Sequence, residues 1–121
     1  MLRKVEVSKR DVCQGDIPRT EAFQLEDGMT VPELLRYIAR HFLWAYLHYK
    51  WEIAGGEPYQ TLGFIACNRQ NRDPSLKTPG DVVAFLNRQI SSDDLVRCCV
   101  PPDKTLRDLN IKKVFCIEHY E

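Results

Sequence analysis

Residues 30–42, TVPELLRYIARHF, decide the fold because they predict one amphipathic helix with a well-marked beginning. Thr30 and Glu33 have the S/T-x-x-E spacing of a capping box, in which side chains satisfy free N–H groups of the first turn. Pro32 lies within that turn, where it removes no intrahelical hydrogen bond. We therefore predict a helix from residue 31 to about residue 45. Its buried face consists of apolar residues at helical spacing: Val31, Leu34, Leu35, Ile38 and Phe42.

Segments with alternating apolar residues lie on both sides of this helix, and alternation is typical of half-buried strands. Residues 2–8 and 20–26 predict an antiparallel hairpin with a long loop. Residues 47–54 and 60–67, separated by a Gly-Gly turn, predict a second hairpin. Residues 95–100 and 113–119 predict two further strands.

A second helix is expected over residues 79–90. Thr78 supplies a cap, Pro79 the first helical position and Asp81 an acid in the first turn. The fold class predicted from this order is α+β: a single domain, 1–121, with a mixed sheet, one long packed helix and an elaborated middle that contains the second helix.

Charge and hydropathy restrict the classes of partner. The 121-residue chain has 17 basic and 17 acidic residues, whereas nucleic-acid binding usually needs a basic excess, so we expect no nucleic-acid partner. The most apolar stretch, residues 42–51, is too short to span a bilayer and no leader sequence is visible, which predicts no membrane partner and a cytoplasmic location. Because the net charge is zero, two copies of the chain repel each other little, and the sequence is compatible with a homodimer.

The sequence contains no arrangement typical of a catalytic or metal site. No C-x-x-C or H-x-x-x-H pair occurs, so no metal is expected. Cys98 and Cys99 are adjacent in a predicted strand and should face opposite ways, one buried and one at the surface. Cys116 and His119 are at odd separation and should not form a nucleophile–base pair. We therefore predict no catalytic residue and no cofactor.

Residues 104–117, KTLRDLNIKKVFCI, resemble the end of ubiquitin-like β-grasp domains, where a T-L-x-D-x-x-I stretch leads into the final strand. Thr105, Leu106, Asp108 and Ile111 match that pattern, and a hairpin followed by a helix that opens T-V-x-x-L-L is similar to the beginning of such domains. The resemblance covers about 60 residues in two pieces. It implies a helix packed on one face of a mixed sheet, with the first and last strands parallel neighbours.

The chain lacks the flexible Gly-Gly tail on which conjugated ubiquitin-like proteins and sulfur carriers of this fold depend, since it ends His119-Tyr120-Glu121. Activation of the carboxyl terminus is therefore not implied. The resemblance implies the fold and the binding of protein partners through the exposed sheet face.

A partner-binding surface is predicted on the sheet face opposite the long helix. If Leu106 and Ile111 lead the chain into the core, Phe115 and Ile117 should be buried against the helix. Alternation then sends Val114, Cys116, Glu118 and Tyr120 to the other face, close to Tyr46 and His48 of the aromatic hairpin. Whether the second helix covers this face stays open. The predicted partner-binding residues are Val114, Cys116, Tyr120, Tyr46 and His48.

The function that these observations favour is a non-catalytic protein-interaction domain, a ubiquitin-like adaptor or regulatory module whose protein partner is unknown. Two alternatives stay open. One is a small toxin-neutralising immunity-type protein, and the other is a small enzyme or ligand-binding domain. A convergent pocket with perturbed ionisable groups would favour an enzyme, and an exposed apolar patch would favour a binding module.

Overall fold

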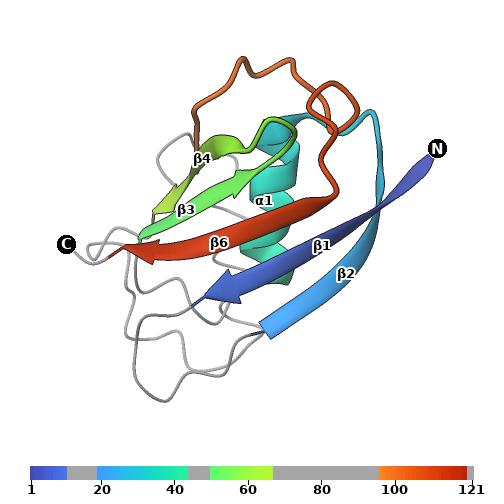
Figure 1. Ribbon diagram of the computed structural model, residues 1–121. Coiled ribbons are helices and arrows are strands. Elements are labelled where there is room, and N and C mark those ends of the chain that lie inside the picture. The colour runs from blue at the N-terminus through green and yellow to red at the C-terminus, as the bar shows by residue number, and fades with distance from the viewer. Residues whose placement is uncertain (11–18, 44–49, 67–95, 120–121) are drawn as a thin grey trace.

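The computed structural model describes residues 1–10, 19–43, 50–66 and 96–119, which form a six-stranded mixed sheet with one helix packed on one of its faces (Figure 1). The fold class is therefore α+β. The strands are β1 (Leu2–Arg10), β2 (Arg19–Glu26), β3 (Lys50–Gly55), β4 (Gln60–Ala66), β5 (Val96–Cys98) and β6 (Lys113–His119), and the helix is α1 (Val31–His41).

The order of the strands is β2-β1-β6-β3-β4-β5, so the last strand of the chain lies in the middle of the sheet beside the first. β1 and β6 are parallel, with Glu6 opposite Lys113 and Arg10 opposite Ile117, whereas the other neighbouring strands are antiparallel. The predicted hairpins and the predicted parallel contact between the first and last strands are confirmed.

Helix α1 begins where its capping residues predict. The backbone N–H of Glu33 donates to the Thr30 hydroxyl at 3.4 Å, and that hydroxyl donates to the Glu33 carboxylate at 2.9 Å. The helix ends at His41, about four residues before the predicted end, and the N–H of Phe42 closes it on the Ile38 carbonyl. Within the described ranges, no helix has the length and apolar content needed to cross a membrane.

The segment before β6 forms a turn with reciprocal caps. The Thr105 N–H donates to the Asp108 carboxylate at 3.0 Å, and the Asp108 N–H donates to the Thr105 hydroxyl at 3.1 Å. These bonds keep the pKa of Asp108 below its usual value. Leu106 and Ile111 are fully buried on either side of the turn. Asp108, one of the residues that match the T-L-x-D-x-x-I pattern, therefore caps the backbone of this turn.

The core lies between α1 and the sheet. The residues of β6 that face this core are not the ones that were predicted to face it. Val114 and Cys116 are fully buried on the helix side and Glu118 is 6% exposed, whereas Phe115 and Ile117 are only half-buried. The prediction exchanged the buried and outer faces of β6 because it continued the apolar alternation from Ile111. Two successive exposed lysines, Lys112 and Lys113, lie between Ile111 and Val114 and shift that phase.

The other core predictions on α1 and the turn are correct. Val31, Leu34, Leu35, Ile38, Phe42, Leu106 and Ile111 have no solvent exposure. The second helix expected over residues 79–90 lies outside the described residues, and the described part of the chain contains one helix.

Candidate functional site

The residues predicted to bind a partner do not form a surface in the described part of the chain. Val114 and Cys116 are fully buried beneath α1, and burial raises the pKa of the Cys116 thiol. Tyr46, His48 and Tyr120 lie outside the described residues. The side chains that β6 places on the opposite sheet face are those of Lys113, Phe115, Ile117 and His119.

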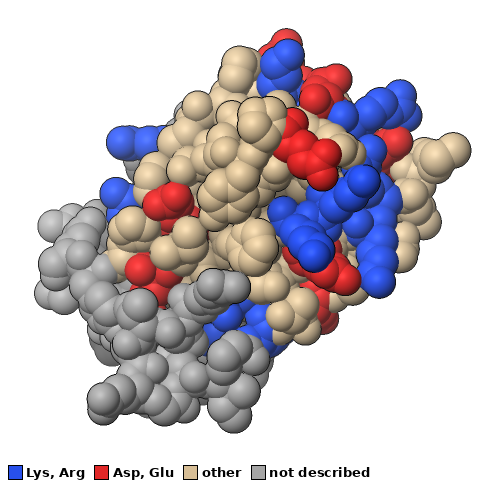
Figure 2. Space-filling view, viewed as in Figure 1, with Lys and Arg blue, Asp and Glu red and all other residues tan. Residues whose placement is uncertain are grey.

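The sheet face opposite α1, called the outer face below, carries an apolar patch. In Figure 1 the helix lies behind the sheet, and Figure 2, from the same side, shows uncharged side chains across the middle of this face. Phe115 and Ile117 reach it from β6 and Phe64 from β4, all half-buried, while Tyr59 precedes β4 and is 60% exposed. These four residues, Tyr59, Phe64, Phe115 and Ile117, are the outer patch.

Ring contacts hold the aromatic members of the outer patch in defined positions. The Tyr59 and Phe115 ring centroids are 6.0 Å apart with 57° between the ring planes. Phe64 makes an edge contact with the His119 ring at 6.3 Å, and the Lys50 ammonium lies 4.6 Å from the Phe64 centroid. Such contacts restrict the rings, so less conformational entropy is lost when a partner packs on them.

A polar trio lies within the same face. Glu52 on β3 accepts a hydrogen bond from the Thr61 hydroxyl at 2.8 Å, and His119 Nε2 lies 2.9 Å from its other carboxylate oxygen. In a nucleophile–base–acid triad the imidazole stands between hydroxyl and carboxylate. Here the carboxylate stands between Thr61 and His119, so the order of the three groups differs from that of the triad.

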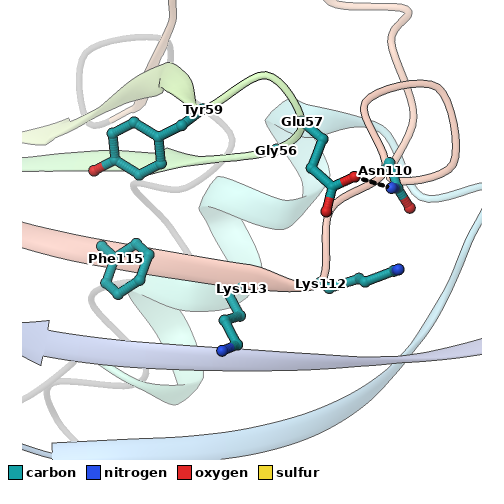
Figure 3. Close-up of a pocket in the computed structure, with 7 residues that line it drawn as sticks. All are labelled: Gly56, Glu57, Tyr59, Asn110, Lys112, Lys113 and Phe115. Carbon is teal, nitrogen blue, oxygen red and sulfur yellow. Dashed lines mark hydrogen bonds between the residues drawn. The ribbon is translucent and has the colours of Figure 1, made fainter.

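A pocket of about 320 Å³ opens at the end of the outer patch, where the β3–β4 turn faces the start of β6 (Figure 3). Its lining combines two aromatic rings, Tyr59 and Phe115, with the polar and charged side chains of Glu57, Asn110, Lys112 and Lys113, and with Gly56. Gly56 has a positive φ of 89° at this turn, a conformation that favours glycine. The outer patch and the pocket share Tyr59 and Phe115, so they form one continuous surface.

The charges at the pocket are unequal. The Asn110 amide donates to the Glu57 carboxylate at 2.6 Å, which turns that carboxylate toward Asn110 (Figure 3). Lys112 and Lys113 are exposed, and neither ammonium lies within ion-pair distance of a carboxylate among the described residues. Glu6, opposite Lys113 in the sheet, lies 3.8 Å from Lys4 instead.

The cysteines in the described part of the chain are free. Cys98 is half-buried against the core and donates to the Val100 carbonyl at 3.2 Å, while Cys99 is exposed. The surface thiol of the predicted pair is therefore Cys99, whereas Cys98 is half-buried and not fully buried as predicted. Across the described ranges, no three His, Cys, Asp or Glu side chains are grouped closely enough to hold a metal ion.

Sequence reasoning missed Phe115, Ile117 and the two lysines as surface residues. Alternation within β6 did not distinguish the two faces, because the buried positions Val114 and Cys116 are followed at the same spacing by a charged residue, Glu118. Comparisons with protein-family models, with curated proteins and with solved structures give no match for this chain.

Proposed function

We propose that this protein is a non-catalytic protein-interaction domain of the β-grasp type, which binds a protein partner through the outer patch. The observation that carries the proposal is the cluster of one exposed and three half-buried apolar side chains on the sheet face away from α1. Aromatic side chains with restricted rotamers are enriched at the energetic centres of protein interfaces.

The β-grasp part of the proposal is supported by the topology. A hairpin, then a helix across one face, then a last strand inserted parallel to the first is the arrangement that the resemblance implies. The Thr105–Asp108 turn that leads into β6 supports it further.

The non-catalytic part of the proposal rests on how the polar groups of the outer face are used. Glu52 has both carboxylate oxygens engaged by Thr61 and His119. The Glu57 carboxylate is engaged by Asn110. Carboxylates engaged by neighbouring side chains fix the shape of a surface, which supports a binding role for this face. A cytoplasmic location and a homodimer stay predictions.

Affinity capture from the native cell tests the proposal when the chain is compared with matched variants. Tyr59→Ala removes the most exposed member of the outer patch, and Gln24→Ala removes an exposed side chain of β2 outside the patch. We expect a partner that wild type and Gln24→Ala retain and that Tyr59→Ala loses. Equal recovery of every captured protein by the two variants would refute the outer patch as the binding surface.

A further inference from the structure

We infer that the pocket between the β3–β4 turn and β6 receives an acidic peptide segment of a protein partner, with one large apolar side chain against Tyr59 and Phe115 and its carboxylates on Lys112 and Lys113. The inference rests on the proposed function and specifies the chemistry of the partner.

The size and shape of the pocket indicate the apolar part of this segment. A volume of about 320 Å³ is at the lower end of the roughly 300–1,000 Å³ typical of ligand pockets, so it suits one side chain rather than a large ligand. The Tyr59 and Phe115 rings are inclined at 57°, and both line the pocket (Figure 3). A planar or branched apolar side chain can contact both rings at once.

The charges indicate the acidic part. Lys112 and Lys113 supply two positive charges at the pocket and Glu57 supplies one negative charge, a formal sum of +1. The hydrogen bond from Asn110 engages the Glu57 carboxylate, whereas the two ammonium groups are open to an incoming anion. A partner carboxylate beside the apolar side chain would therefore gain charge-assisted hydrogen bonds.

The surrounding charges favour a peptide over a nucleic acid, although stacking on aromatic rings beside lysines would suit both. A nucleic-acid strand needs a basic track along several phosphates. Here the carboxylates of Glu6, Glu52 and Glu57 interrupt the same face, and Figure 2 shows Lys and Arg gathered mainly beside the start of β6 with acidic atoms among them. A short acidic segment needs only the two lysines.

An NMR titration of the full chain with a synthetic pentapeptide tests the inference. The probe has a central tryptophan flanked by two glutamates on each side. We expect amide shift changes centred on Tyr59, Lys112, Lys113 and Phe115, and weaker binding at high salt because exposed charges are screened. The double variant Lys112→Glu/Lys113→Glu should lose roughly tenfold or more in affinity, because two charge-assisted contacts become repulsive.

The matched control is Lys104→Glu, which reverses an exposed lysine outside the pocket lining and should bind the probe like wild type. Superimposable spectra of the free variants establish that each is folded. The inference is overturned if a lysine-flanked pentapeptide, an alanine-centred pentapeptide or a single-stranded thymidine hexamer binds as tightly as the probe. It is also overturned if the shift changes lie elsewhere.

The two proposals fail separately. If Tyr59→Ala loses the captured partner but the acidic probe does not bind at the pocket, the outer patch stands as the interface and the acidic segment is wrong. If Tyr59→Ala captures the same proteins as Gln24→Ala and the acidic probe does not bind at the pocket, both proposals fail.

Discussion

Val7 and Val114 lie opposite each other where β1 and β6 run parallel, and neither has any solvent exposure. This pair joins the first and last strands of the chain beneath α1. It also fixes the orientation of β6, because a buried Val114 places Lys113 and Phe115 on the outer face.

Substitution of neighbouring residues on β6 tests this orientation. Val114→Glu should unfold the protein, because an ionised carboxylate without a partner in the core costs several kcal/mol. Lys113→Glu changes an exposed position and should alter the free energy of unfolding by no more than about 0.5 kcal/mol. Urea denaturation followed by circular dichroism measures both. A folded Val114→Glu variant of normal stability would show that the orientation is wrong.

The close packing of α1 on β4 gives a second prediction. A Cβ atom at Gly63 would lie 2.6 Å from the Leu35 side chain and against the Arg97 carbonyl of β5. Gly63→Ala should therefore destabilise the protein by about 1–3 kcal/mol through overpacking.

Gly28→Ala is its matched control, because a Cβ atom there meets nothing within 4 Å. Thermal denaturation of the two variants makes the comparison. An unchanged melting temperature for Gly63→Ala would contradict the described contact between α1 and β4.

Acid should weaken the fold through two aspartates near the β6 turn. Hydrogen bonds from the Arg107 guanidinium lower the pKa of Asp27, and the bonds from Thr105 lower that of Asp108. In the unfolded chain the pKa of an aspartate carboxyl is about 3.9. Around and below that pH the unfolded state therefore binds more protons than the folded state. The stabilisation is complete above that pH and is lost as the pH falls through the lower folded pKa values.

The urea midpoint should therefore fall as the pH is lowered from about 5 toward 2. Asp27→Asn removes one titrating group and should make this fall shallower. A variant whose pH dependence matches that of wild type would mean that the bonds between Asp27 and Arg107 do not form in solution.

Thiol reactivity should differ between two cysteines of the described chain. A thiolate is the reactive form, and burial raises the pKa of Cys116 while Cys99 is exposed. Brief treatment of the native protein with iodoacetamide should label Cys99 and leave Cys116 unmodified until denaturant is added. Peptide mass spectrometry locates the label, and rapid native labelling of Cys116 would show that β6 does not bury it.

Much of the fold follows from short-range rules in the sequence. Thr30 and Glu33 mark the start of α1, and Gly55 and Gly56 mark the turn of the β3–β4 hairpin. The parallel contact of β1 and β6 was not available from such rules and depended on the resemblance around Thr105, because strand order is set by contacts between distant segments.

The candidate site was predicted on the sheet face opposite α1, but two of its predicted residues, Val114 and Cys116, lie on the buried face of β6. Alternation has a period of two, so one extra residue before a strand exchanges its two faces. Lys112 is that residue, since it follows Ile111 in the connection that enters β6. The pocket could not be predicted from local sequence. It is lined by Tyr59 from the β3–β4 turn and by Lys113 from β6, which only the tertiary structure brings together.

Photo-crosslinking in the native cell tests the central claim, that the outer patch binds a protein partner, most directly. Benzoylphenylalanine is placed at Tyr59 in one variant and at Glu33, an exposed position on α1, in another. The account predicts a discrete covalent adduct from position 59 that is absent at position 33. An adduct at position 33 alone, or the same adducts at both positions, would contradict it.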